Sequence, residues 1–344
     1  MTPPNEFIVP GNLTAPQFGK VRVRKTGSEC EVDLTILMEP QGTEAEGWQT
    51  GVALDGSSSM QNWYGRELEG KVPPDLMADY ERRGLIDLLE LDGRKVRCFQ
   101  QASFEDAIAR GFLKFSKNIV EPLAREFISY LAGTLDADGG TTVIYWACGG
   151  GHEMEVVGDF TTDQCRSLVI QGPAKVSFGN GTQLGPALRY FVERFKDAKR
   201  GMYVFLTDGK LDDLRAVKFL TTSLAKDIQS GSRNPVKCVL IGVGEEIDER
   251  QMEELDDLDT GTEVDIWDHK IAKDMRSVVE IFAEVVSDNL IIAPVATVYT
   301  ASGVVAKRFT DGLPARAKFL LPGDCQWFDL EVGGQRIRQQ LKTP

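Results

Sequence analysis

The chain has 344 residues, 42% of them hydrophobic, and a formal net charge of −13 at pH 7. This length suffices for one large domain plus a smaller one, and the apolar fraction is ordinary for a globular protein. The acidic balance argues against nucleic acid as the main partner, because the phosphate backbone repels such a surface. No apolar run approaches the roughly 20 residues that a membrane-spanning helix requires.

The first ten residues lack the basic and apolar pattern of a secretory signal. The six cysteines are scattered and form no C-x-x-C pair, so we expect buried free thiols in a reducing cytoplasm. Only two histidines are present, His152 and His269, which argues against a zinc centre. These observations favour a cytoplasmic protein.

Both ends of the chain have a β texture. Residues 1–47 contain two alternating runs, Val21–Lys25 and Cys30–Met38, that predict a hairpin. Residues 289–344 contain about five strand-like runs, separated by turn signals such as Asp311-Gly312. Because a lone hairpin is only marginally stable in water, we expect both termini to form one small antiparallel β-sandwich. Two unrelated flanks are the alternative. The expected C-terminal strands are Leu290–Thr300, Val304–Phe309, Arg316–Leu321, Trp327–Val332 and Gln335–Gln340.

Residues 48–288 alternate between strand-like and helix-like segments, which predicts an α/β domain with a doubly wound, mostly parallel sheet, inserted in the sandwich. Apolar residues from Phe112 to Leu131 recur at helical spacing, although Pro122 requires a kink or a new start there. The expected strands are Thr50–Leu54, Thr141–Cys148, Glu153–Val157, Met202–Leu206, Val236–Val243 and Glu263–Trp267, and the other helices are Leu184–Phe195, Leu211–Ile228, Glu249–Leu258 and Met275–Val286.

One stretch, Met60–Gln101, does not fit the alternation. It contains Pro73-Pro74, a candidate short helix at Leu76–Arg83 and an Asp92-Gly93 hairpin signal. A connection this long inside a compact domain is usually functional or mobile.

Oxygen-bearing side chains follow the ends of two expected strands. The turn after the first reads Asp55-Gly56-Ser57-Ser58-Ser59, and Asp208 follows another strand in a Thr-Asp-Gly turn. Thr182 lies at the entrance of the helix that begins near Leu184. Open α/β sheets bind ligands at the carboxyl ends of their strands, and a hard cation such as Mg²⁺ prefers oxygen ligands. The pattern therefore predicts a divalent-cation site.

The order D-x-S-x-S, Gly-Thr, Thr-Asp-Gly resembles the metal-ion-dependent adhesion site of von Willebrand factor A domains, over roughly residues 48–288. In style the chain is similar to the intracellular bacterial members associated with tellurium resistance and stress response. The resemblance implies Mg²⁺, Ca²⁺ or Mn²⁺ bound by these side chains, directly or through water, and coupling to movement of the last helix, Met275–Val286. The implied metal ligands are Asp55, Ser57, Ser59, Thr182 and Asp208. The family usually passes almost directly from the D-x-S-x-S turn into its first helix, so Met60–Gln101 is a departure from it.

The adhesion-site mechanism that the resemblance implies is recognition of a partner. A cation held mainly by neutral hydroxyls keeps much of its charge and attracts an Asp or Glu carboxylate from another protein. We therefore expect a non-enzymatic binding module in a multi-protein assembly. The alternatives are a metal-dependent hydrolase such as a phosphatase, and a scaffold with a vestigial site. A rival motif at Gly65–Val72 approaches a P-loop but lacks its final Ser or Thr.

Overall fold

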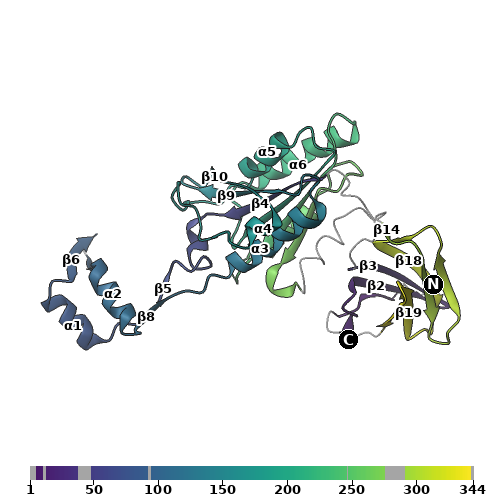
Figure 1. Ribbon diagram of the computed structural model, residues 1–344, viewed down its shortest axis with the longest axis horizontal. Helices are drawn as coiled ribbons and strands as arrows, with labels where there is room; N and C mark the ends of the chain where they lie inside the picture. Colours follow the sequence, from purple (N-terminus) through teal and green to yellow (C-terminus); the bar gives the residue numbers. More distant parts are fainter. Residues whose placement is uncertain are drawn as a thin grey trace.

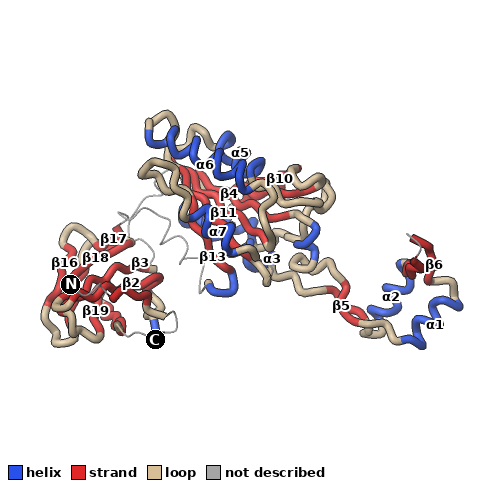
Figure 2. The backbone as a smooth tube through the Cα atoms, turned by 180° about the vertical axis from the view of Figure 1, so that it is seen from behind, coloured by secondary structure: helices blue, strands red, loops and turns tan. Residues whose placement is uncertain are grey.

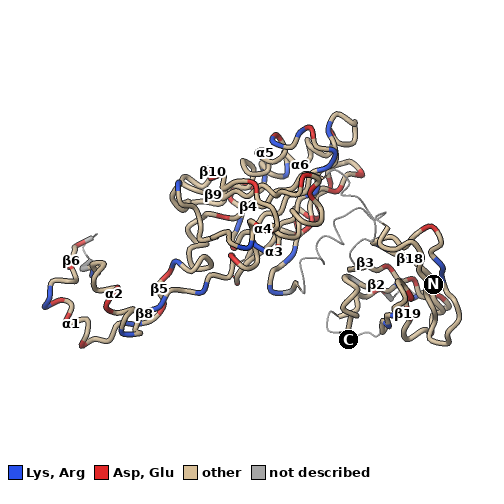
Figure 3. The backbone as a smooth tube through the Cα atoms, in the orientation of Figure 1, with Lys and Arg blue, Asp and Glu red and all other residues tan. Residues whose placement is uncertain are grey.

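The computed structural model describes residues 5–10, 13–37, 48–91, 94–245, 247–275 and 291–341. Figures 1 and 2 show three parts in a row: a central α/β body, a β-sandwich built from both termini on one side, and a small arm on the other. Lys and Arg are interspersed with Asp and Glu along each part (Figure 3), but the net charge of −13 falls almost entirely on the central body, where residues 48–67 and 116–288 contain 20 Lys and Arg against 32 Asp and Glu.

The central body is organised around a six-stranded sheet in the order β10-β9-β4-β11-β12-β13. Its neighbouring pairs are parallel, except that the edge strand β10 runs antiparallel to β9. All eight residues of β9 are buried, as expected for a strand covered on both faces. The strands are β4 (Trp48–Asp55), β9 (Thr141–Cys148), β10 (Glu153–Phe160), β11 (Arg200–Thr207), β12 (Val236–Gly242) and β13 (Trp267–Ile271).

Helices cover both faces of this sheet (Figure 1). One apolar core is completed by α3 and α4, and the other by α5, α6 and α7. Phe191 of α5 stacks on Tyr203 of β11 in the second core, with ring centroids 5.0 Å apart. The predicted doubly wound α/β fold is therefore confirmed. The helical segments are α3 (Val120–Tyr130), the following π-helical turn (Leu131–Leu135), α4 (Thr162–Cys165), α5 (Gly185–Arg194), α6 (Leu214–Gln229), α7 (Glu249–Asp256) and the short 3-10 helices η2 (Ser58–Gln61) and η4 (Ala272–Asp274).

Two expected elements lie elsewhere in the structure. Phe112 and Phe115 are not part of the helix that contains Leu131, because α3 begins only at Val120. Pro122 is then its third residue, where the missing N–H costs no intrahelical bond. The strand expected at Glu263–Trp267 is also wrong, because β13 starts at Trp267. The helix expected at Met275–Val286 falls almost entirely outside the described residues.

The terminal β region contains two four-stranded sheets, ordered β1-β2-β3-β18 and β16-β15-β19-β20. The N- and C-terminal segments pair directly, with β3 antiparallel to β18 over seven residue pairs. The two sheets share one apolar core, in which Phe319 meets Phe328 edge to face at 5.1 Å. The predicted shared sandwich is thus confirmed. Its strands are β1 (Asn5–Ile8), β2 (Phe18–Thr26), β3 (Glu29–Ile36), β15 (Ala296–Thr300), β16 (Val305–Phe309), β18 (Arg316–Pro322), β19 (Trp327–Val332) and β20 (Gln335–Gln340), beside a short pair, β14 (Ile291–Ala293) and β17 (Leu313–Pro314).

The third part, which we call the arm, comprises residues 68–115. It leaves and rejoins the body through a two-stranded ribbon, in which Leu68 of β5 pairs with Phe115 of β8. A separate small core, with Tyr80 fully buried, holds its helices and hairpin together. The short helix expected at Leu76–Arg83 is present as α1. Its elements are β5 (Leu68–Gly70), α1 (Pro74–Arg82), β6 (Ile86–Leu91), β7 (Arg94–Phe99), α2 (Gln101–Ala109) and β8 (Leu113–Phe115).

The cysteines are all free, and five of the six are buried, with Cys98 in the arm half-buried. Among the helices that the structure describes, none combines the length and apolar character needed to span a bilayer.

Asp33 joins the two chain ends electrostatically. It lies on β3, and its carboxylate receives two hydrogen bonds from the Arg316 guanidinium at 2.9 and 2.8 Å and lies 3.3 Å from Lys318 Nζ. Burial alone would raise the pKa of Asp33, but its bonds to these two cations outweigh burial and hold the pKa below its usual value.

We predict that Asp33→Asn lowers the free energy of unfolding at pH 7 by about 1.5–3 kcal/mol, the range for hydrogen bonds to charged groups. A carboxyl whose pKa is lowered by folding stabilises above its unfolded pKa of about 3.9 and loses this effect as the pH falls through the folded value. The difference between wild type and variant, measured by urea unfolding, should therefore shrink below about pH 4. A constant difference from pH 7 to pH 2.5 would contradict this account.

Candidate metal-binding site

The predicted site residues lie where the two central strands end. β4 and β11 are parallel neighbours, paired so that Leu54 lies beside Leu206. The residues that follow, Asp55 and Thr207, therefore emerge side by side at the carboxyl edge of the sheet. Asp208 comes one residue later. The register of one strand pair thus brings together two segments that are about 150 residues apart in the sequence.

Asp55 is the most enclosed of the five predicted ligands, with no exposed surface. Its Oδ1 accepts the Ser57 backbone N–H at 2.7 Å, and its Oδ2 accepts the Thr207 hydroxyl at 2.6 Å. Burial raises the pKa of Asp55 to about 7; the two hydrogen bonds oppose this, and the negative charge of Asp208 adds to it. The carboxylate is therefore placed where a nearby cation would stabilise its charge.

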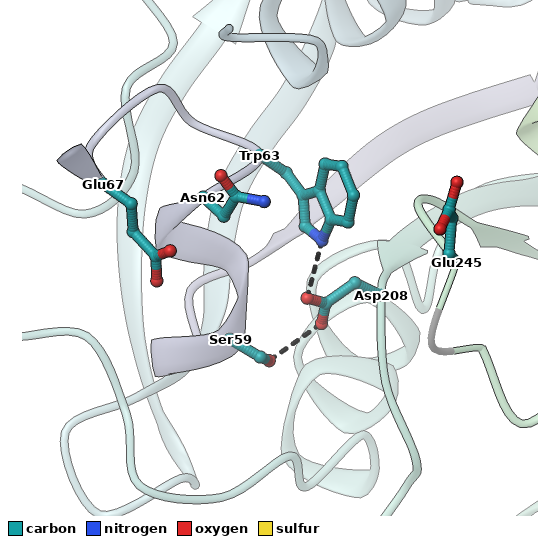
Figure 4. Close-up of a pocket in the computed structure, with 6 residues that line it drawn as sticks. All are labelled: Ser59, Asn62, Trp63, Glu67, Asp208 and Glu245. Carbon is teal, nitrogen blue, oxygen red and sulfur yellow. Dashed lines mark hydrogen bonds between the residues drawn. The ribbon is translucent and has the colours of Figure 1, made fainter. Parts of the chain in front are cut away.

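A chain of hydrogen bonds continues from the turn after β4 to Asp208. The Ser57 and Ser59 hydroxyls are 3.1 Å apart, and Ser59 Oγ donates to Asp208 Oδ1 at 2.9 Å. The second oxygen of Asp208 accepts the indole N–H of Trp63 at 3.0 Å (Figure 4). Ser57 and Asp208 are each 3% exposed, whereas Ser59 is open to solvent. The oxygen cluster is thus accessible from the Ser59 side.

Thr182 belongs to a loop that is bonded to the same turn. The Gly179 N–H donates to Gly56 O at 2.9 Å, and Gly179 O accepts the Ser58 N–H at 2.8 Å. A side chain at residue 179 would overlap the carbonyl of Ala147, so glycine is required for this close approach. The pairing of Gly179 with Ser57 carries Thr182, three residues further on, to the carboxyl edge.

A pocket of about 380 Å³ opens beside the oxygen cluster. Trp63 forms part of its wall and packs against Gly244, where a Cβ would clash with the indole ring. The base of the arm contributes Glu67 and the loop after β12 contributes Glu245 (Figure 4). The complete lining is Ser59, Asn62, Trp63, Glu67, Asp208 and Glu245. A ligand that reaches Asp208 would therefore pass a polar, acidic surface.

The structure joins four of the five predicted ligands, Asp55, Ser57, Ser59 and Asp208, by direct contacts, and brings in Thr182 through its loop. Sequence reasoning missed Trp63 and Thr207 as partners of the two aspartates. Thr207 stands inside the Thr-Asp-Gly motif and so carried a signal. The role of Trp63 depends on the conformation of residues 58–65, for which we found no sequence signal.

The donor set suits a hard divalent cation, because it consists of two carboxylates and three hydroxyls, all oxygen ligands. Within the described residues, no three His, Cys, Asp or Glu side chains form a group that could hold a metal ion by themselves. The predicted ligand set differs from such a group, because three of its five side chains are hydroxyls. His269, one of the two histidines, lies within β13 and is engaged with Asp256 at 2.6 Å.

We predict that Asp55→Asn stabilises the metal-free protein at pH 8, because it removes a buried charge near Asp208, while the amide oxygen can still accept the Ser57 N–H and the amide nitrogen can donate to the Thr207 hydroxyl. The melting temperature in EDTA should rise above that of wild type, and added Mg²⁺ should raise the wild-type value but not the variant's. Equal Mg²⁺-induced shifts in the two proteins would remove Asp55 from the site.

Comparison with known proteins gives limited similarity. No protein-family model matches the chain, and no curated protein matches it in sequence. Among solved structures, the chain is similar to the PilB minor pilin from Streptococcus sanguinis, with a TM-score of 0.35 and 11% identity, over 82% of this chain and 76% of the pilin. A single-residue mutant of that pilin gives a TM-score of 0.36 and 8% identity, over 83% and 78% of the two chains.

Proposed function

We propose that the edge formed by Asp55, Ser57, Ser59, Thr182 and Asp208 binds one divalent cation, Mg²⁺ or alternatively Ca²⁺ or Mn²⁺, through which the protein holds an Asp or Glu side chain of a partner protein. The observation that carries this proposal is the hydrogen-bonded run from buried Asp55 through the solvent-exposed Ser59 to Asp208, which is buried. Its buried carboxylates supply negative charge for a cation, and its exposed side at Ser59 admits a ligand. We place this activity in a cytoplasmic multi-protein assembly.

Binding accounts for the site better than catalysis does. Hydrolysis at a metal needs a positioned base or acid near the reacting atoms. The two aspartates are engaged with Ser57, Thr207, Ser59 and Trp63, which leaves them poorly placed as proton carriers. His269 is bonded to Asp256 in β13, and the other histidine, His152, lies exposed in the glycine-rich turn between β9 and β10. Capture of a carboxylate requires only the vacant cation position.

We predict that capture of the partner from a source lysate depends on the cation and on Thr182. EDTA should abolish capture, and Thr182→Ala should weaken it by at least about tenfold, or about 1.4 kcal/mol, because one ligand is lost. Thr222→Ala is a matched control, since that half-buried threonine lies on α6 and its hydroxyl bonds only its own helix, at Lys218 O.

Equal capture by wild type in EDTA and by Thr182→Ala would show that the metal face is not the docking surface. Turnover of a phosphate ester that EDTA abolishes and Asp208→Ala removes would favour the hydrolase alternative.

We further predict that the arm selects the partner without contributing to cation affinity. Its core is separate from the cores of the body, and Leu68 and Phe115 are paired neighbours, so a short Gly-Ser linker can replace the residues between them. The trimmed protein should bind Mg²⁺ within about twofold of wild type by calorimetry, equal to about 0.4 kcal/mol, and lose partner capture. Weaker Mg²⁺ binding, or unchanged capture, would contradict this division of roles.

A further inference from the structure

The loop between β11 and α6 contains two aspartates in addition to the predicted ligand Asp208. Asp212 is joined to Thr182 by two hydrogen bonds that run in opposite directions. Its backbone N–H donates to Thr182 O at 2.9 Å, and its Oδ2 accepts the Thr182 N–H at 2.8 Å. Two ligands from distant segments, Thr182 and Asp208, are therefore connected through four residues of one loop.

The next aspartate extends this connection to α5. The two oxygens of Asp213 accept the N–H groups of Leu184 and Gly185, each at 2.9 Å. These groups belong to the helix start, where backbone donors have no intrahelical acceptor. The segment from Thr182 to Gly185 is thus fixed to the loop at both of its ends.

On its other side the same loop is fixed to α7. The Leu211 N–H donates to Gln251 Oε1 at 2.8 Å, and Gln251 Nε2 donates to Leu211 O at 3.3 Å. Leu211 is 3% exposed and Gln251 is 7% exposed, so the loss of either bond would leave a buried polar group without its partner. This pair anchors the loop at the residue directly before Asp212.

We propose that Asp212 is a positioning residue of the metal site, which holds Thr182 at a fixed place relative to Asp208, and that Gln251 anchors the loop that does so. The inference rests on the proposed function, since it concerns the same cation. Neither residue is a predicted ligand. Their effect is to order Thr182 and Asp208 before the cation arrives, so that binding does not bear the entropic cost of assembling them.

The test is titration of the full-length protein with Mn²⁺ alone, by calorimetry, together with melting temperatures in EDTA. Asp212→Ala should weaken Mn²⁺ binding by about 10–100-fold, the usual effect of removing a group that orients a metal ligand. Asp212→Asn should restore binding to near the wild-type value, because its amide oxygen can still accept the Thr182 N–H. This rescue separates the hydrogen bond from the negative charge.

Two further variants complete the design. Gln251→Leu should weaken Mn²⁺ binding in the same direction, and its effect should not add to that of Asp212→Ala, because both act on one loop. Asp136→Ala is the matched control. Asp136 accepts backbone N–H groups of Thr50 and Asp138 at the opposite end of the sheet, so it should lower the melting temperature in EDTA and leave Mn²⁺ affinity unchanged.

The outcomes are distinguishable. If wild type does not bind Mn²⁺, the proposed function fails and this inference fails with it. If wild type binds but Asp212→Ala binds equally well, only the positioning role is overturned. Equal weakening by Asp212→Asn and Asp212→Ala would assign the effect to charge and would also overturn it. If Asp212→Ala does not fold, unchanged Mn²⁺ affinity in Gln251→Leu decides against the proposal.

Discussion

The site depends on one buried carboxylate. Asp55 ends the central strand β4 with no exposed surface, and hydrogen bonds from Ser57 and Thr207 only partly compensate for the loss of water. A second carboxylate, Asp208, follows the neighbouring strand and adds repulsion. This arrangement lowers stability, because burying a charge beside a like charge costs free energy that apolar packing at the same position would not. The divalent cation that we propose for this edge would compensate the charge of both carboxylates.

The position of Asp55 relative to the other site residues follows from the pairing of parallel strands. Pairing of β4 with β11 fixes the relative height of Asp55 and Thr207, and glycine at 179 lets a third segment approach closely enough to carry Thr182. Loops deform more easily than strands. The loop that carries Thr182 therefore needs a further restraint to hold its position. The bonds from the loop of Asp212 to Thr182 supply that restraint. The strands thus bring the residues of the candidate site to one edge of the sheet, and hydrogen bonds between side chains and backbone fix the loop residues among them.

Much of this was predictable from sequence, for identifiable reasons. β9, β19 and β20 match their expected bounds, because turns flank short runs rich in β-branched, aromatic or alternating residues. The motifs of the candidate site could be recognised because the residues within each motif are close together in the sequence. Other features were not predictable. Helical spacing before Val120 was misleading, since Phe112 immediately precedes the ribbon strand β8 and Phe115 is its last residue. The partners Trp63 and Asp212 depend on loop conformation, which periodicity does not encode.

The positions of the flanking parts bear on how a partner would be recognised. The arm leaves the body directly after Glu67, which lines the pocket beside Asp208. A partner held at the cation would therefore lie near the base of the arm, whose tip carries exposed apolar residues such as Leu88, 60% exposed. A cation contact alone selects only for a carboxylate, which most proteins present. Discrimination needs a second surface, and the arm, attached beside the pocket but with a core of its own, can vary without disturbing the residues of the candidate site.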